Sequence, residues 1–154
     1  MDESFQIGPG VLIPRPETEL LALTTLQRLE SWEHPVVFDL CAGSGCLGLS
    51  IAKRRPDAEV FLLEKSEAAF AYLRRNADRI APANTHLQLG DLMDGFQSFD
   101  FPAPQVIVSN PPYIRSAEIS GLQREVRHEP RMALDGGEDG LLFYRVLAER
   151  WVPP

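Results

Sequence analysis

The sequence lacks the features that mark several large classes of protein. Only two of its 154 residues are cysteine, Cys41 and Cys46, and no second ligand pair follows at zinc-site spacing. We therefore expect reduced structural thiols and no metal. No apolar run approaches the ~20 residues that span a bilayer, and the N-terminus lacks the basic-then-apolar order of a signal peptide. These absences predict a cytoplasmic protein with no membrane partner.

Positive charge is also scarce. Fifteen Lys and Arg residues stand against 22 Asp and Glu residues, which gives a net charge of −7 at pH 7 and a pI near 4.9. Proteins that hold a nucleic acid usually present a basic stripe, because phosphate contacts dominate their affinity. The one short basic cluster, residues 53–55, is typical of a solvated helix end. Nucleic acid is therefore a disfavoured partner, although a local basic patch stays an open alternative.

The hydrophobic pattern predicts one α/β domain. The length is enough for a single core, and apolar runs typical of buried parallel strands alternate with segments of helical spacing. We expect strands over residues 36–40, 59–64, 85–89 and 105–109, and helices over residues 16–31, 47–55, 67–80, 119–127 and 141–151. This alternation predicts a doubly wound parallel sheet with helices on both faces.

The turn after the first strand has the form of a ligand-binding turn. Residues 39–48 contain the pattern G-x-G-x-x-G between a predicted strand and a predicted helix. Gly43 and Gly45 allow a tight turn and the close approach of a ligand to the positive end of that helix. Cys41 and Ala42 lie in the same turn and join the candidate binding residues. Alone, the pattern also fits a structural turn without a ligand.

Acidic residues end three successive strands. Glu64 follows Asp39 by 25 residues, a position where a carboxylate can bind both hydroxyls of a ribose; it could also pair with Lys65, a further candidate. Asp39 would repel the pyrophosphate of NAD, but it can orient water and an amino group beside a sulfonium ligand. Asp91 can accept a hydrogen bond from an adenine amino group while Leu92 covers the ring, although a plain turn is the alternative. Glu64 fits both cofactors equally, whereas Asp39 and the pair Asp91 and Leu92 favour S-adenosylmethionine over NAD.

The most specific motif follows the fourth strand. Asn110, Pro111, Pro112 and Tyr113 offer a side-chain carbonyl and a backbone carbonyl about 3 Å from one NH₂ group, which would fix its plane and stabilise the charge that develops on attack. The prolines stiffen the loop and remove competing donors, and Tyr113 can lie against a planar group. The motif therefore predicts methyl transfer to a planar nitrogen, with a simple Asn-Pro turn as the alternative.

Together these motifs resemble the class I methyltransferases that modify planar nitrogens, and within them the release factor glutamine-N5 methyltransferase family. Residues 11–19, 109–114 and 129–141 carry the closer resemblance, which extends over nearly the whole chain. It implies a Rossmann-like fold and methylation of the glutamine in the Gly-Gly-Gln loop of a peptide chain release factor. Nucleic acid would then enter only through the ribosomal setting of that substrate.

The resemblance also implies roles for individual residues. The cofactor positions of the family correspond to Asp39, Gly43, Gly45, Glu64, Asp91 and Leu92, with Asn110 close by. Residues 110–113 correspond to the motif that holds the glutamine. Arg15 and Glu17 match the hinge segment of the family, and neither they nor residues 129–141 have a role that their chemistry indicates.

The chain departs from the family at both ends. Family members carry an N-terminal helical domain, whereas this chain begins almost at the hinge, and it stops where the next strand of the sheet should start. We therefore expect an extended hinge over residues 1–16 and an incomplete catalytic domain over residues 17–154, with the last strands missing. Two other functions stay open: a nucleic-acid adenine-N6 or guanine-N2 methyltransferase, and a fragment that binds S-adenosylmethionine without catalysis.

Overall fold

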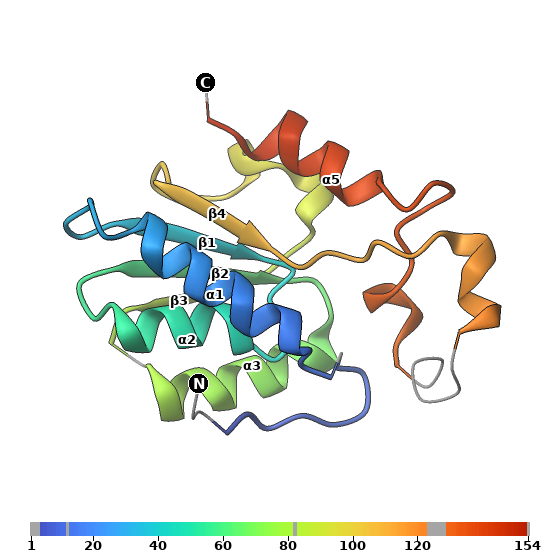
Figure 1. The fold of residues 1–154 in the computed structure, drawn as a ribbon, viewed down its shortest axis with the longest axis horizontal. Helices are drawn as coiled ribbons and strands as arrows, with labels where there is room; N and C mark the ends of the chain where they lie inside the picture. Colours follow the sequence, from blue (N-terminus) through green and yellow to red (C-terminus); the bar gives the residue numbers. More distant parts are fainter. Residues whose placement is uncertain (1–3, 12, 82, 123–128, 154) are drawn as a thin grey trace.

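Four parallel strands form the centre of the molecule. The structure, a computed structural model, describes residues 4–11, 13–81, 83–122 and 129–153. The strands are β1 (Val36–Leu40), β2 (Glu59–Glu64), β3 (Thr85–Leu89) and β4 (Val106–Ser109), and they lie in the order β3-β2-β1-β4 (Figure 1). The chain thus continues from β1 toward β3 on one side and places β4 on the other. The four predicted strands are confirmed, and the strand order reverses between β1 and β4 while all strands stay parallel.

Helices cover both faces of this sheet. The α-helices are α1 (Pro16–Arg28), α2 (Cys46–Arg54), α3 (Glu67–Ile80) and α5 (Leu142–Val146), and the π-helical segment η5 (Leu147–Trp151) continues α5. Short 3-10 segments are η1 (Leu92–Asp94), η2 (Phe96–Ser98), η3 (Ser116–Gly121) and η4 (Arg131–Ala133). In Figure 1, α1, α2 and α3 lie on one face and α5 lies on the other. This arrangement confirms the predicted doubly wound fold.

The starts of the helices follow from local chemistry. Pro16 occupies the first turn of α1, where its missing N–H costs no hydrogen bond. Glu17 and Glu19 lie in the same turn and are favoured there by the helix dipole. In α3 the Ser66 hydroxyl accepts a hydrogen bond from the Ala69 N–H at 3.2 Å, which caps the helix.

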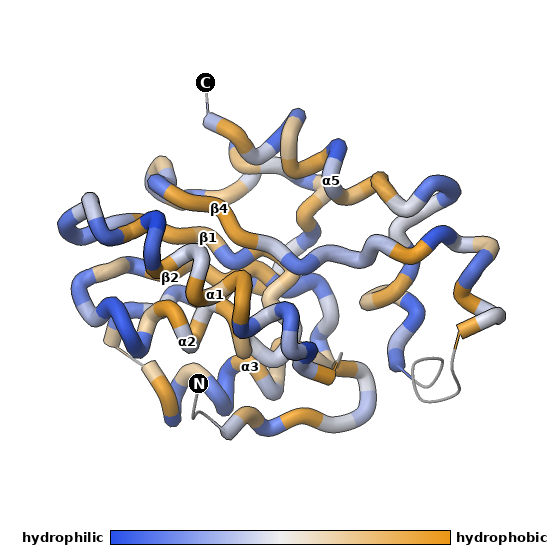
Figure 2. Tube along the Cα trace, in the orientation of Figure 1, coloured by the Kyte–Doolittle hydropathy of each residue, from blue (hydrophilic) through white to orange (hydrophobic). Residues whose placement is uncertain are grey.

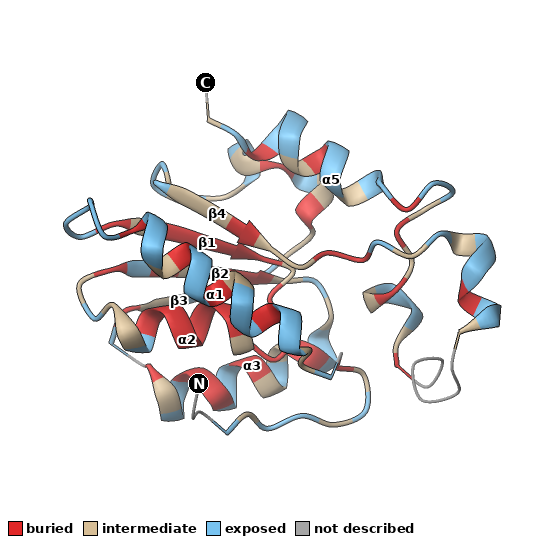
Figure 3. Cartoon of the chain, in the orientation of Figure 1, coloured by how far each residue is buried: buried red, intermediate tan, exposed pale blue. Residues whose placement is uncertain are grey.

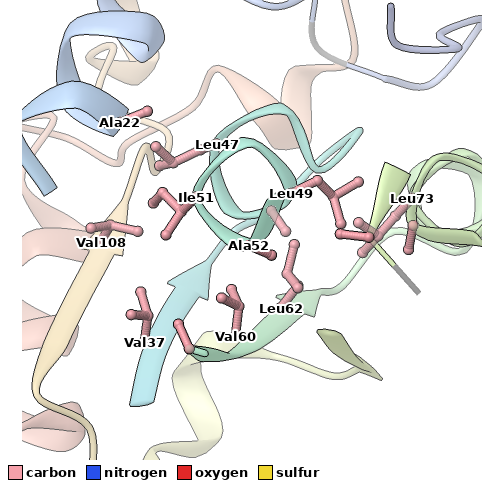
Figure 4. Packing of buried hydrophobic residues seen from close by; sticks show 14 of the residues in the cluster. Ala22, Val37, Leu47, Leu49, Ile51, Ala52, Val60, Leu62, Leu73 and Val108 are labelled. Atoms are coloured by element: carbon pink, nitrogen blue, oxygen red, sulfur yellow. The ribbon is translucent and has the colours of Figure 1, made fainter. Parts of the chain in front are cut away.

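The core has two layers because strand side chains alternate between the faces of the sheet. One layer lies between the sheet and helices α1, α2 and α3. Its buried strand residues pack against residues of α2 such as Leu49 and Ile51, and they are Val37, Val60, Leu62 and Val108 (Figure 4). On the opposite face Phe38, Leu40 and Leu63 pack with aromatic residues and Trp151. Figure 2 shows hydrophobic residues along the strands, and Figure 3 shows that most of β1 and half of β2 are buried, whereas β3 and β4 are largely intermediate or exposed.

Two predicted helices differ from the observed elements. The helix expected over residues 141–151 is α-helical only to Val146 and π-helical from Leu147 to Trp151. In this wider turn the Trp151 indole is buried and its Nε1–H donates to the Leu92 carbonyl at 2.7 Å. Of the helix expected over residues 119–127, the first part belongs to the 3-10 segment η3, and residues 123–127 lie outside the described residues. None of the described helices combines the length and the apolar character needed to cross a membrane.

Candidate active site

A cavity of about 190 Å³ opens at the carboxyl ends of the strands, where ligands bind in sheets of this type. Its wall comes from the turns after all four strands, from the N-terminal segment and from residues 130–133. Ten of the predicted site residues line it: Asp39, Cys41, Ala42, Gly43, Glu64, Lys65, Asp91, Leu92, Asn110 and Pro112. Gly45, Pro111 and Tyr113 are not among the lining residues.

Gly43 and Gly45 of the turn have different structural roles. At Gly43 (φ 58°) an added Cβ would meet nothing within 4 Å, so the backbone there faces open space in which a ligand can approach. At Gly45 (φ 90°) a Cβ would lie 2.5 Å from a Leu73 side-chain carbon and 2.7 Å from one of Leu49. Gly43 therefore leaves room for a ligand, whereas Gly45 permits the packing of α2 against α3.

Both cysteines of this turn carry free thiols. Burial raises the pKa of Cys46 to about 11, and burial together with the charge of Glu64 raises the pKa of Cys41 further. A thiol is nucleophilic as the thiolate. Both side chains therefore act as small apolar wall groups at neutral pH, and Cys41 holds a left-handed backbone (φ 68°) that few residues other than glycine adopt.

Asp39 organises the start of α2. Its Oδ2 accepts a hydrogen bond from the Gly48 N–H at 2.8 Å, and the side chain is almost fully buried. Burial raises its pKa to about 7, against the lowering effect of the Gly48 hydrogen bond. A Cβ on Gly48 would lie 2.8 Å from the same Oδ2, so glycine is required for the carboxyl group to reach the helix backbone.

Glu64 is tied to the glycine turn. Its Oε2 accepts from the Gly43 N–H at 2.8 Å and its Oε1 accepts from the Ser66 N–H at 3.1 Å. An ionised carboxylate has about four acceptor sites, so each oxygen keeps one for a ligand hydroxyl. Burial raises the pKa of Glu64. The carboxylate is thus already oriented, with free acceptor capacity at the cavity wall.

The surface pair that Glu64 and Lys65 could have formed is absent among the described contacts. Lys65 Nζ lies 3.2 Å from Asp91 Oδ2 instead, and Asp91 Oδ1 accepts from the Met93 N–H at 2.9 Å. Asp91 therefore caps the 3-10 segment η1 while still lining the cavity. Leu92 beside it is buried, which supplies the apolar neighbour that an adenine ring needs.

The Asn110 side chain makes no hydrogen bond within the part of the chain that the structure describes, and it lines the cavity. Pro111 and Pro112 are buried, whereas Tyr113 is 57% exposed. The following residue, Ile114, forms a bridge with Asp135, with hydrogen bonds from Ile114 N to the Leu134 carbonyl and from Gly136 N to the Ile114 carbonyl.

The segment after residue 128 supports this motif from behind. A Cβ on Gly136 would lie 2.7 Å from the Tyr113 Cα and 2.9 Å from the Pro112 carbonyl oxygen. Asp135 Oδ1 accepts from the Ser116 hydroxyl at 2.5 Å and from the Gly137 N–H at 3.0 Å. The residues at 135–137 thus form a turn that holds the loop of Asn110 in place.

Two distant segments form a further wall of the cavity, which the sequence did not predict. Arg15 Nη2 lies 2.7 Å from Glu129 Oε2, and the Glu129 side chain is only 4% exposed. The Ile13 N–H also donates to Glu129, at 3.3 Å. Ile13 and Arg15 line the cavity together with Met132 of the second segment. Both segments carried the resemblance described above, but Arg15 and Glu129 are separated by 114 positions along the chain, so no local pattern in the sequence indicated their pairing.

The donor set of the site suits an organic ligand. Among the described residues, no group of three or more His, Cys, Asp or Glu side chains could hold a metal ion. The oriented Glu64 carboxylate can take ribose hydroxyls, Asp91 and Leu92 can border a base, and the open backbone at Gly43 can border the remainder of a nucleoside sulfonium. The residues present therefore fit S-adenosylmethionine.

Known proteins are similar to this chain in sequence. The chain is 44% identical over 148 residues to the release factor glutamine methyltransferase of Thermodesulfovibrio yellowstonii, across 94% of this chain and 52% of that protein. It is 45% identical over 146 residues to the protein of the same name from Geobacter sulfurreducens, across 93% and 49%. The chain spans about half the length of the curated relatives it matches.

Solved structures share the fold. The hMettl16 catalytic domain, in complex with a MAT2A 3′UTR hairpin, superposes with a TM-score of 0.75 at 17% identity, over 96% of this chain and 55% of that one. A human methyltransferase 10 domain containing protein superposes with a TM-score of 0.58 at 18% identity, over 72% and 54%. At these identities the likeness concerns the fold alone.

A family model provides the broader assignment. The model described as the methyltransferase small domain matches residues 17–142, a range that contains all four strands and every predicted site residue. The chain therefore belongs to the methyltransferase small domain family, with S-adenosylmethionine as its cofactor, as the resemblance predicted.

Proposed function

We propose that this chain is the catalytic core of a methyltransferase that acts on the side-chain amide nitrogen of the glutamine in the Gly-Gly-Gln loop of peptide chain release factors. The observation that carries the proposal is the position of Asn110. It lines the same cavity as Glu64 and Asp91, so the place for a planar amide adjoins the place for the methyl donor. The names of the similar proteins support this substrate over DNA or RNA.

In the proposed reaction the chain holds the amide more than it activates it chemically. The side-chain carbonyl of Asn110 and the backbone carbonyl of Pro111 accept the two N–H groups, which aims the nitrogen lone pair at the methyl carbon and stabilises the developing positive charge. S-adenosylmethionine supplies the methyl group as a sulfonium. The new bond joins nitrogen to carbon, the carbon–sulfur bond breaks, S-adenosylhomocysteine leaves and the nitrogen loses one proton to solvent.

The finer roles of the other site residues belong to the same proposal. Glu64 binds the ribose hydroxyls, Asp91 and Leu92 border the adenine, and Asp39 shapes the turn around the sulfonium end. Tyr113 shields the amide from water. The division into a hinge over residues 1–16 and a catalytic domain over residues 17–154 is proposed on the same basis, as is a cytoplasmic location.

Methyl transfer from labelled S-adenosylmethionine tests the proposal. The purified chain is incubated with a release factor, with the same factor carrying Gln→Ala in its Gly-Gly-Gln loop, with DNA and with rRNA. We expect label in the first substrate and none in the second. Label in DNA or rRNA but not in the release factor would overturn the substrate assignment, and binding of the cofactor without transfer to any substrate would identify a non-catalytic module.

A further inference from the structure

The N-terminal segment, residues 4–11, lies along helix α3 in a regular register, and we call it the N-terminal strap. Every second residue of the strap contacts α3, and each contact lies about one helical turn closer to the N-terminus of α3 than the contact before it. The pairs are Ser4 with Arg79, Gln6 with Asn76, Gly8 with Tyr72 and Gly10 with Ala68. Figure 1 shows the strap passing beside α3 before it turns toward α1. At its far end, Gly10 reaches the wall of the cavity.

The strap approaches α3 so closely that a side chain at either of two positions would displace side-chain atoms of the helix. A Cβ on Gly8 would lie 2.1 Å from the Tyr72 hydroxyl oxygen, and one on Gly10 would lie 2.9 Å from the Ala68 Cβ. Gly10 also holds a left-handed backbone, with φ +86°. The two glycines therefore permit a tight contact between the strap and the helix.

One buried amide joins the strap to the glycine turn. Asn76 is fully buried. Its Oδ1 accepts from the Gln6 N–H at 2.8 Å, and its Nδ2 donates to the Gln6 carbonyl at 3.0 Å and to the Ser44 carbonyl at 2.9 Å. Ser44 lies between Gly43 and Gly45 and lines the cavity, whereas Asn76 is not a lining residue. Asn76 thus contacts the strap at Gln6 and the cavity wall at Ser44, and it does not line the cavity itself.

We propose that Asn76 is a positioning residue that couples the N-terminal strap to the glycine turn, so that both close around S-adenosylmethionine as one unit. The inference rests on the proposed cofactor role of this cavity. The amide is suited to the task because it supplies two donors and an acceptor at once. A carboxylate of the same shape would direct an oxygen at the Gln6 and Ser44 carbonyl oxygens and would separate the strap from the turn.

The test is Asn76→Asp, with Asn84→Asp as its matched control. Asn84 is also buried, and its Nδ2 donates to the carbonyls of Ala52, Arg55 and Ala58, none of which lines the cavity. In both variants buried backbone carbonyls lose the hydrogen bonds that the amide Nδ2 donates, so we expect both variants to have a lower Tm. Isothermal titration with S-adenosylmethionine, below both melting temperatures, should show at least a tenfold weaker Kd for Asn76→Asp and less than a twofold change for Asn84→Asp.

Hydrogen exchange, measured with and without the cofactor, reports the strap and the glycine turn separately. In the wild-type chain, S-adenosylmethionine should slow exchange of the strap amides, and in Asn76→Asp this protection should disappear while protection of the glycine turn is only weakened. Gln6→Pro removes the strap N–H that Asn76 accepts, at an exposed residue. It should reproduce the loss of strap protection even if Asn76→Asp does not fold.

The outcomes separate the two proposals. If the wild-type chain does not bind S-adenosylmethionine, the cofactor assignment itself fails. If the wild-type chain binds and Asn76→Asp binds as tightly as Asn84→Asp, the coupling role is wrong. Unchanged protection of the strap in Gln6→Pro would lead to the same conclusion.

Discussion

The half of the cavity that fits the cofactor and the half that fits the methyl acceptor are held in place by different means. On the cofactor side, Asp39 and Ser44 are almost fully buried, and the carboxyl groups of Asp39 and Glu64 bond directly to backbone N–H groups. On the acceptor side, Tyr113 and Met132 are more than half exposed. The loop there is held by bonds to another loop.

This difference follows from position in the sheet. β1 and β2 each have a strand on both sides, whereas β4 pairs only with β1 among the described strands. The turns after the central strands are therefore enclosed by core packing, and the loop after β4 extends beyond it (Figure 3). A common cofactor can be bound by a rigid half-site, while the exposed half can meet a macromolecular substrate. The following changes test whether the two halves act separately.

Removal of the Asn110 side chain should give the largest effect. We expect Asn110→Ala to lower kcat for methyl transfer roughly 10²–10³-fold, the usual effect of losing one oriented group that stabilises transition-state charge. The Kd for S-adenosylmethionine should change by less than about threefold, because Glu64 and Asp91 are untouched. Rapid-quench transfer assays and titration measure the two quantities. An equal loss in both would show that the halves are not separate.

A methyl group behind the acceptor loop should give the next largest effect. In Gly136→Ala the Cβ would press on the Tyr113 Cα at 2.7 Å and on the Pro112 carbonyl oxygen at 2.9 Å. A displacement of about 1 Å can lower a rate by ~10²-fold, so we expect a loss of that order in transfer with cofactor binding retained.

Gly121→Ala is the matched control for this change. Nothing lies within 4 Å of a Cβ on Gly121, and its transfer rate should stay within about twofold of the wild-type rate. Equal activity of both glycine variants would refute the supporting role of residue 136.

The burial of Asp39 should appear as a pH dependence of stability on the cofactor side. Its pKa is raised from 3.8 to about 7, so between these values the folded chain retains a proton that the unfolded chain has released. As far as this group is concerned, stability of the ligand-free chain should therefore be highest below about pH 4 and fall by roughly 4 kcal/mol until about pH 7, because each pKa unit corresponds to about 1.4 kcal/mol. The pKa of Asp57 is lowered, so this carboxyl group changes the free energy of unfolding only at lower pH.

Asp39→Asn isolates that contribution. The amide oxygen can still accept the Gly48 N–H, and the group no longer titrates. Denaturant melts from pH 4 to pH 8 should show a smaller fall in the free energy of unfolding for the variant than for the wild-type chain. Parallel curves would mean that Asp39 is already ionised in the folded chain at pH 5.

Glu64→Gln should have the smallest of these effects, confined to cofactor affinity. The variant keeps one acceptor oxygen, and it replaces a charge-assisted bond to the ligand, worth about 1.5–3 kcal/mol, by a neutral one worth about 0.5–1.5 kcal/mol. We expect S-adenosylmethionine to bind roughly tenfold more weakly. Glu59→Gln on the same strand is the control, because Glu59 is half exposed and pairs with His86. Similar affinity in both variants would exclude Glu64 from the ribose site.

The regular elements were the most predictable part of the molecule. The strands over 59–64 and 85–89 and the helix over 67–80 have the predicted bounds, because hydrophobic period and capping residues are local. The π-helical end at Leu147–Trp151 was not predicted, since it depends on the bond from Trp151 to the distant Leu92 carbonyl.

The sequence by itself determined the succession of strands and helices along the chain, the glycine turn, the acids at the strand ends and the Asn-Pro-Pro-Tyr motif. Each depends on neighbours a few residues away, and a parallel sheet necessarily brings its strand ends to one edge. Only the tertiary structure decided which residues hold these groups: Asn76 between strap and turn, Glu129 on Arg15, and Gly136 behind Tyr113. Those contacts join segments far apart in the chain, and no local pattern specifies which distant partner a buried amide or carboxylate will meet.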